Sequence, residues 1–241
     1  MTYKDEKRDG KYTSWYGNGQ KEYEGIYKDG KLDGLYTEWY ENGQKWKEIT
    51  YKDGKIYFTL NIWDRYGEIM VKDGNGLYTE WYENGLKRWD RTFKDGKQDG
   101  LWTWWWENGQ KYSEETYKDG KQDGKWTDWY ENGQKSYEET YKDGKANGKR
   151  TSWYSNKQKR SEGTFKNDII DGKWTEWYEN GQKYCEETYK DKKQDGKWTY
   201  WRVNGQKKKE YTYKDGMRIE VTRWDEDGNV TLHDKYEPHR V

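Results

Sequence analysis

The strongest constraint on this chain is a motif of about 24 residues that recurs in phase along nearly its whole length. Residues 125–148 are an almost complete copy of the consensus Lys-Trp-Thr-x-Trp-Tyr-Glu-Asn-Gly-Gln-Lys-x-x-Glu-x-Thr-Tyr-Lys-Asp-Gly-Lys-x-Asp-Gly. One glycine marks the phase of the copies, with a lysine replacing it once. These positions are Gly19, Gly43, Gly85, Gly109, Gly133, Lys157, Gly181 and Gly205. Such periodicity predicts an array of similar units, each packed on its neighbours.

Each copy contains the dipeptides Asn-Gly and Asp-Gly, which favour two-residue type I′ turns. The residues between them are rich in Thr, Tyr and Trp, which favour β-strands. One copy therefore predicts two antiparallel strands, and helices are not expected. The predicted fold class is all-β, a single elongated and twisted antiparallel β-meander of tandem β-hairpin repeats.

The turns also predict a register. With Asn108-Gly109 as a two-residue turn, Glu107 pairs with Gln110 and Tyr117 lies opposite Gly100. We expect the glycine at this mid-strand position to make room for the ring of the tyrosine. Lys157, at the turn glycine's position, is expected to cost about 1 kcal/mol because positive φ is strained in a residue with a Cβ.

This register gives each copy two faces. In the copy at 125–148, one face carries Trp126 and Tyr141, and the other carries Thr127, Trp129 and Glu138. The tryptophan of the second face recurs in every copy, beginning with Trp15. The recurring tryptophans form a ladder that we predict to be the partner-binding surface: Trp39, Trp81, Trp105, Trp129, Trp153, Trp177 and Trp201. Exposed aromatic patches commonly mark binding sites.

Two stretches depart from the period, and they suggest domain boundaries. Residues 55–74 form a shortened, more aliphatic copy, and the C-terminal residues resemble it in sequence. Because repeat arrays need atypical end units, both stretches are interpreted as caps. The predicted organisation is hairpin repeats over 1–54, a degenerate cap-like hairpin over 55–74, six repeats over 75–216, and a capping hairpin with a tail over 217–241.

Composition narrows the function classes. The 46 basic residues balance 46 acidic ones, so binding to nucleic acid or to an anionic membrane through charge alone is not expected. The opening residues do not resemble a signal peptide, and no apolar run has the length of a membrane span. We predict a cytoplasmic protein. Cys185 stands where other copies carry Ser113, Tyr137 or Ser161, which suggests a tolerated surface position.

Catalytic and metal chemistry find little support in the sequence. The recurrent glutamates are better explained as a cross-strand ladder with Thr and Lys than as catalytic carboxylate pairs. The Asp-Gly segments are flanked by lysines, so turn formation is favoured over calcium binding. His233 and His239 lack the further ligands of a zinc site. We therefore predict no enzyme activity, no catalytic residues, no cofactor and no metal.

The pattern Asp-Gly-Lys-x-Asp-Gly-x-Trp…Tyr-x-Asn-Gly resembles the bacterial variant of the MORN repeat, from about Asp9 to Gly216. The resemblance implies a meandering sheet of hairpins that acts as a scaffold. Some bacterial members are labelled antitoxins, which implies neutralisation of a toxin by binding. MORN repeats have also been linked to phospholipids, a role that usually requires an excess of basic residues.

Two function classes remain open from the sequence. The first is a non-catalytic scaffold that binds a protein partner, in one version as an antitoxin. The second is a module that binds cell-wall polysaccharide on stacked Trp and Tyr rings. Self-association through the end strands is a further expectation for either class.

Overall fold

The computed structural model describes residues 3–4 and 7–236, and every regular element in them is a β-strand. The chain forms two compact units. The N-terminal unit comprises Met1–Glu107 with Tyr117–Gly120, and the C-terminal unit comprises Asn108–Thr116 with Lys121–Val241. The predicted all-β fold of tandem antiparallel hairpins is confirmed. The predicted tail at 237–241 and His239 lie outside the described residues.

In the N-terminal unit, β1 and β2 pair with each other, and from β3 onward each strand pairs with the next along the chain. The strands are β1 (Tyr3–Lys4), β2 (Lys7–Arg8), β3 (Gly10–Trp15), β4 (Lys21–Lys28), β5 (Lys31–Trp39), β6 (Lys45–Lys52), β7 (Lys55–Trp63), β8 (Ile69–Lys72), β9 (Asn75–Trp81), β10 (Lys87–Lys94) and β11 (Lys97–Trp105).

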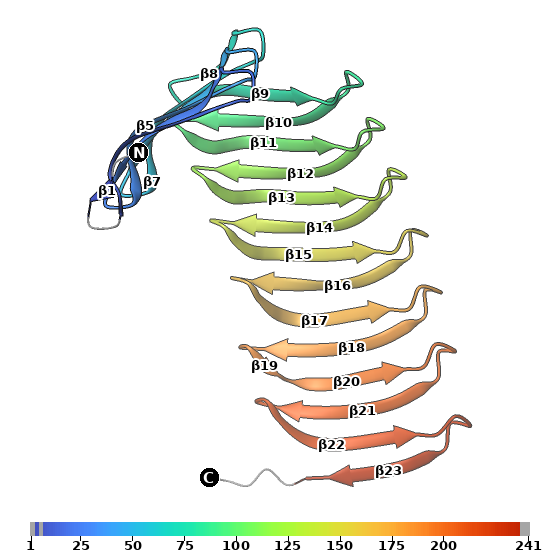
Figure 1. Cartoon of the computed structure of the whole chain (residues 1–241). Helices are drawn as coiled ribbons and strands as arrows, with labels where there is room; N and C mark the ends of the chain where they lie inside the picture. The colour runs from blue at the N-terminus through green and yellow to red at the C-terminus, as the bar shows by residue number, and fades with distance from the viewer. Residues whose placement is uncertain (1–2, 5–6, 237–241) are drawn as a thin grey trace. The chain divides into compact units, whose positions relative to one another are not determined.

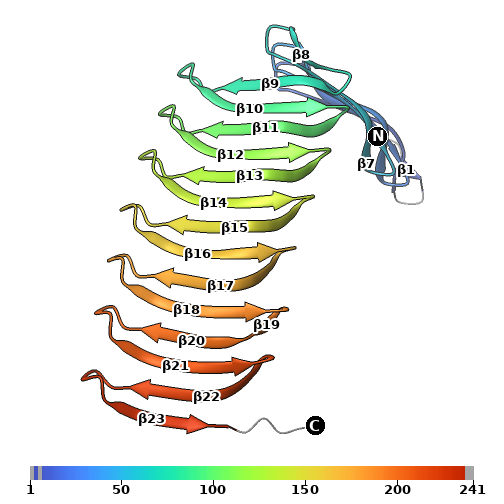
Figure 2. The ribbon, with the colours of Figure 1, turned by 180° about the vertical axis from the view of Figure 1, so that it is seen from behind.

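In the C-terminal unit the strands lie side by side in chain order (Figures 1 and 2). They are β12 (Lys111–Lys118, of which the residues to Thr116 belong to this unit), β13 (Lys121–Trp129), β14 (Lys135–Lys142), β15 (Lys145–Trp153), β16 (Lys159–Lys166), β17 (Ile169–Trp177), β18 (Lys183–Lys190), β19 (Lys193–Gln194), β20 (Gly196–Trp201), β21 (Lys207–Lys214), β22 (Met217–Trp224) and β23 (Val230–Lys235).

The Asp-Gly turns have the predicted two-residue form. Lys142 pairs with Lys145, and the turn residues Asp143 and Gly144 have φ of 51° and 81°. Positive φ at both central residues is the signature of a type I′ turn. The turn is kept even where Lys192 replaces the glycine, with φ of 69°.

The Asn-Gly turns differ from the prediction. The N–H of Tyr130 donates to the carbonyl of Gln134 at 2.8 Å, and the N–H of Gly133 donates to the carbonyl of Tyr130 at 2.8 Å. The loop therefore has three residues and ends in a glycine with positive φ, a form in which a type I turn precedes a bulge. A further register shift follows, so that Asp128 pairs with Tyr137.

The predicted mid-strand register nevertheless holds. Gly124 pairs with Tyr141, which is the equivalent of the predicted Gly100–Tyr117 pair. The extra loop residue and the bulge at Ser136 compensate each other, so the strand interior keeps its alignment. The predicted reason for the glycine is wrong, however. Gly124 has φ of 127°, and a Cβ there would lie 2.9 Å from Cβ of Thr116, so backbone conformation and a threonine exclude larger residues.

Neighbouring turns are joined by bonds from fixed residues of the repeat. The hydroxyl of Tyr130 donates to the carbonyl of Trp153 at 2.7 Å, and the Asn156 side chain donates to the carbonyl of Glu179 at 2.8 Å. The same tyrosine bond recurs from Tyr16 to Trp39, Tyr40 to Trp63, Tyr82 to Trp105, Tyr154 to Trp177 and Tyr178 to Trp201. The constant residues of the motif thus build the scaffold.

The array is interrupted in the N-terminal unit by a short strand. β8 has 4 residues where β6 has 8. It pairs with β7 only at Ile62 and Trp63, and the N–H of Gly74 at its turn donates to the carbonyl of Leu60 at 2.8 Å. The first part of β7 therefore extends beyond the β8–β9 turn. The boundary between the two compact units falls near residue 108 of the sequence. The proposed caps at 55–74 and 217–241 stay predictions.

Both faces of the sheet contain buried side chains. On the predicted Trp126 face, Glu139 is 1% exposed and Trp198 is 7% exposed. On the opposite face, the recurring threonines are buried, with Thr127 6% exposed. In the N-terminal unit, Ile62, Val71 and Tyr78 form a hydrophobic cluster. The thin core is thus divided between aromatic rings on one face and threonines beneath longer side chains on the other.

Candidate functional site

The predicted tryptophan ladder lies at the ends of strands. Its members are the last residues of β5, β9, β11, β13, β15, β17 and β20: Trp39, Trp81, Trp105, Trp129, Trp153, Trp177 and Trp201. Trp81 is 45% exposed, and the other six are half-buried. The ladder is therefore only a partly open surface.

Lysines cover the faces of most of these rings. The ammonium of Lys183 lies 5.5 Å from the ring centroid of Trp201 and 2.6 Å from a carboxylate oxygen of Glu186. The corresponding lysines lie 5.2–5.7 Å from Trp39, Trp105, Trp129 and Trp177. Cation–π attraction and ion pairing act on the same lysine. The recurrent glutamates accordingly act as a lysine-paired ladder.

These ion pairs lower the pKa of the glutamate carboxylates. Hydrogen bonding from Lys11 and Lys21 holds the pKa of Glu24 below its usual value, and Lys135 does the same for Glu138. A charged glutamate with two lysine partners has no proton to donate, and its carboxylate is already occupied by the lysines. It is therefore not free to act as the acid or the base that general acid–base catalysis requires.

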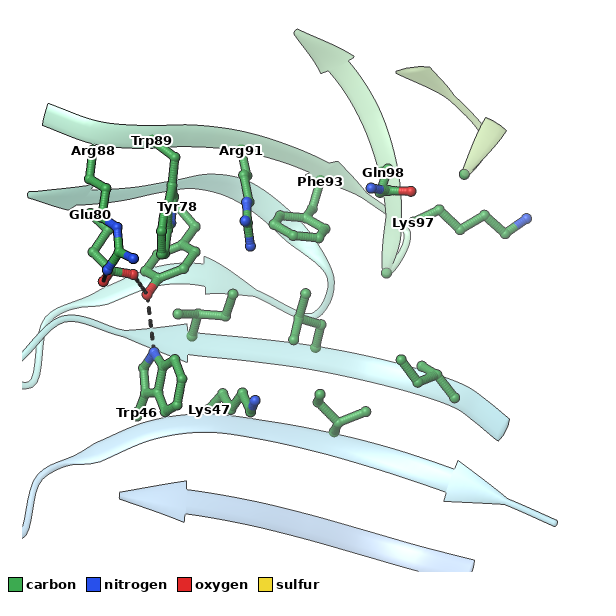
Figure 3. A pocket seen from close by; sticks show the side chains of 16 residues that line it. Trp46, Lys47, Tyr78, Glu80, Arg88, Trp89, Arg91, Phe93, Lys97 and Gln98 are labelled. Atoms are coloured by element: carbon green, nitrogen blue, oxygen red, sulfur yellow. Dashed lines mark hydrogen bonds and ion pairs between the residues drawn. The ribbon is translucent and has the colours of Figure 1, made fainter. Parts of the chain in front are cut away.

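A pocket of 790 Å³ opens in the N-terminal unit, beside the short β8–β9 hairpin (Figure 3). Ile49, Leu60 and Ile62 supply an aliphatic lining from β6 and β7. From β10, Arg88, Trp89, Arg91 and Phe93 follow one another along the opposite wall (Figure 3). The volume falls in the range of ligand sites in proteins. We call this hollow the apolar pocket.

A hydrogen-bonded bridge lies at one end of the apolar pocket. The indole N–H of Trp46 donates to the Tyr78 hydroxyl at 3.1 Å, and that hydroxyl donates to Glu80 at 2.9 Å (Figure 3). Burial raises the pKa of Tyr78, so it stays a neutral donor. The same three residues also line a second hollow of 620 Å³ towards the Asn-Gly turns. The two hollows are therefore adjacent and share one wall.

Two arginines give the apolar pocket its charge. Arg88 lies 3.4 Å from a carboxylate oxygen of Glu80 and stacks over Trp89 at 4.4 Å. Arg91 lies over Trp89 at 4.5 Å and over Trp102 at 5.1 Å, and burial lowers its pKa. Among the described residues no carboxylate forms an ion pair with Arg91. Its buried Nε and the buried indole nitrogen of Trp89 also have no acceptor there.

Five residues of the apolar pocket occupy variable positions of the repeat. The consensus leaves five positions open, represented in the copy at 125–148 by Asp128, Ser136, Tyr137, Glu139 and Ala146. Their equivalents 48 residues earlier all line the pocket: Glu80, Arg88, Trp89, Arg91 and Gln98. Constant residues thus form the framework, and variable residues collect on one surface.

Three of these five positions also line a hollow in the C-terminal unit. Its volume is 440 Å³, and Ser152, Arg160, Ser161, Glu176 and Tyr184 are among its residues. The variable surface is therefore a property of the repeat. Sequence reasoning assigned the binding surface to the constant tryptophans and missed the apolar pocket. The available signal was the set of open consensus positions, together with the aliphatic short copy.

A further prediction concerns Cys185. Cys185 is 2% exposed, so the predicted surface position is wrong. The equivalent Ser113 is also buried, at 5%, because a small side chain at this position lies among larger ones on neighbouring strands, such as Tyr200 opposite Cys185. Burial, followed by Glu176 and Glu187, raises the pKa of Cys185 to about 12, so the thiol stays protonated at neutral pH.

Metal and membrane features are few in the described residues. No group of three or more His, Cys, Asp or Glu side chains there is placed to hold a metal ion. His233 contacts Thr222 at 3.0 Å through Nδ1. The part of the chain that the structure describes has no helix that is long and apolar enough to cross a membrane.

Fold and pairing together define a tandem β-hairpin repeat protein. The family described as MORN repeat variant matches residues 8–29, 32–53, 98–119, 122–143, 146–167 and 170–191. These segments cover more than half of the chain, which therefore belongs to the MORN repeat variant family. A search of curated proteins gave no match. Much of the apolar pocket, including all four of its β10 residues, comes from the stretch between the second and third matched segments.

Proposed function

We propose that this chain is a non-catalytic repeat scaffold that binds a protein partner, and that the apolar pocket is its principal contact surface. One observation carries the proposal: Glu80, Arg88, Trp89, Arg91 and Gln98 all occupy open consensus positions and all line one hollow. The strand register brings these positions together, and in this copy they carry aromatic and charged side chains around a hollow. Aromatic and arginine side chains around a hollow are typical anchors of protein interfaces.

The tryptophan ladder is a second candidate surface for the same partner. On β9, Thr79 and Trp81 alternate with the pocket residues Tyr78 and Glu80, although Trp39 and Trp81 also line the second hollow beside the apolar pocket. Lysines already cover five of the seven rings, which reduces the area left for an incoming side chain. The same cover weakens the alternative of polysaccharide stacking on the ladder.

Affinity capture with matched variants tests the proposal. Wild type, Phe93→Ala in the apolar pocket and Trp177→Leu in the ladder are used to capture proteins from the native lysate, with sizing of each variant as a folding control. We expect a stoichiometric partner with wild type and Trp177→Leu but not with Phe93→Ala. Loss with Trp177→Leu alone would move the contact to the ladder, and retention on cell-wall polysaccharide without any protein would favour the carbohydrate function.

An antitoxin role is a narrower version of the same proposal. It requires that the captured partner be toxic when expressed alone. Co-expression of the partner with wild type is then expected to restore growth, and co-expression with Phe93→Ala is expected not to. If the partner is not toxic, the antitoxin role is contradicted and the scaffold function still stands.

A further inference from the structure

The positive charge of the apolar pocket is only partly compensated among the described residues. Arg88, Arg91, Lys47 and Lys97 line it, against the single carboxylate of Glu80. Glu80 already accepts from Tyr78 and lies beside Arg88, and Lys47 pairs with Glu38 at 2.9 Å. Arg91 and Lys97 are left without a paired carboxylate among the described residues, and of these two only Arg91 is half-buried.

The C-terminal unit shows one way in which a charge at this repeat position is paired. Arg91 is equivalent to Glu139, and Trp102 is equivalent to Arg150. Glu139 and Arg150 form a buried ion pair, with Arg150 Nε 2.7 Å from the carboxylate. At the apolar pocket the sign of the charge is inverted and the opposing ion is replaced by an indole. A half-buried guanidinium with an unpaired N–H is costly until an acceptor arrives.

The lining next to Arg91 is apolar. Phe93 and Trp89 flank it on β10, and Leu60 and Ile62 line the same pocket from β7. A group that pairs with Arg91 must therefore bring an apolar body with it. The second hollow lies beyond the Trp46–Tyr78–Glu80 bridge and gives such a ligand room to continue. This favours an internal stretch of polypeptide over a chain end.

We propose that the apolar pocket binds an extended segment of a protein partner in which an apolar side chain lies next to an Asp or Glu. The apolar side chain packs against Leu60, Ile62 and Phe93, and the carboxylate accepts hydrogen bonds from Arg91. A carboxylate fits better than a phosphorylated side chain, because one half-buried cation, Arg91, lacks a carboxylate partner among the described residues, and its single charge matches a carboxylate better than a phosphate with a charge of about −2. This inference rests on the proposed function and specifies the chemistry of its partner.

The test uses a random dodecapeptide library displayed on phage and selected on the full-length wild-type chain. Enriched sequences are expected to carry Leu, Ile, Phe or Trp within two positions of Asp or Glu. Synthetic copies of the best peptides are then titrated by tryptophan fluorescence. We expect Arg91→Gln to weaken binding at least tenfold, Arg91→Lys to weaken it about threefold, and binding to fall with added salt.

Matched variants keep the outcomes distinct. Arg160→Gln lies at the repeat position of Arg88 but in the C-terminal unit, and it is expected to bind like wild type. If Arg91→Gln fails to fold, Arg88→Gln replaces it as the test variant, because the Arg88 side chain is 47% exposed. A twofold to fivefold loss of peptide affinity is then expected. Peptides that compete with the captured partner yet lack acidic residues would overturn the carboxylate inference and leave the scaffold function standing. Selection of phosphopeptides over their Glu counterparts, or no enrichment above background, would also overturn it.

Discussion

Arg150 holds the carboxylate of Glu139, a side chain only 1% exposed, through its Nε at 2.7 Å and its Nη2 at 2.5 Å. The hydroxyls of Tyr137 and Tyr141 donate to the second carboxylate oxygen. Arg150 also lies 3.7 Å over the ring of Phe165. Arg150 thus takes the place that an aromatic residue, such as Trp174 or Trp198, occupies in other strands.

Removal of the cation alone should destabilise the C-terminal unit. Arg150→Met leaves Glu139 buried without its counter-charge, and we expect a loss of about 2–4 kcal/mol in the free energy of unfolding, since Arg150 is partly exposed. Arg150→Trp restores the consensus residue and is expected to cost about 1 kcal/mol or less. Urea unfolding of both variants provides the measurement. Equal losses would show that the ion pair contributes no more than packing does.

Alkaline pH should weaken the fold through the buried tyrosines. Burial, aided by Glu80, raises the pKa of Tyr40 from 10.0 to about 12. Above pH 10 the unfolded chain loses a proton that folded Tyr40 keeps, so its contribution is complete below pH 10 and is lost as pH rises towards 12. We expect a Tyr40→Phe variant to show a shallower fall of the urea midpoint between pH 9 and 11.5. A slope identical to that of wild type would contradict this assignment.

The turn at Lys157 should be improvable. Lys157 has φ of 73° and its N–H donates to the carbonyl of Tyr154 at 3.0 Å, as glycine does in the other copies. Lys157→Gly is expected to stabilise the chain by about 0.5–1 kcal/mol, because glycine adopts positive φ without strain. The reverse change, Gly181→Lys at φ of 82°, should destabilise it by about the same amount. Thermal unfolding is the measurement: the melting temperature is expected to rise for Lys157→Gly and to fall for Gly181→Lys.

Cys185 should resist alkylation in the native state. The thiol is 2% exposed and its pKa is raised to about 12, so the reactive thiolate is both scarce and shielded. We expect iodoacetamide at pH 8 to modify it at least a hundredfold more slowly than in urea. Cys185→Ser with Ser155→Cys, which moves the thiol to an exposed loop position, is the control. Rapid labelling of native Cys185 would mean that β18 opens locally.

The sequence predicted the strands and their pairing well because one repeated motif specifies both. Turn dipeptides set the strand ends, and the glycine–tyrosine register was correct although the Asn-Gly loop has one more residue than expected. The bulge at Ser136 absorbed that residue, and such compensation has no signature in a single turn motif. Cys185 was misplaced because a position that varies among copies was taken to be exposed.

The apolar pocket could not be predicted in the same way. It depends on β8 having half the usual strand length. The first part of β7 therefore has no paired strand on its β8 side, and Ile56 and Leu60 line the hollow there. Periodicity shows that the copy is short but not where the missing residues leave space. The positions of Arg88 and Arg91 were visible as deviations from the consensus, and only the fold shows that these deviations converge.

Site-specific photo-crosslinking tests most directly whether the partner contacts the variable surface. A photoreactive amino acid replaces Arg88 at the apolar pocket, Arg160 at the same repeat position of the other unit, or Lys125, which lies on the ladder face with its side chain 67% exposed. The crosslinked lysate is analysed by mass spectrometry. We predict one major protein adduct from position 88 and little from positions 125 and 160. An adduct from position 125 with none from position 88 would contradict the proposed binding surface.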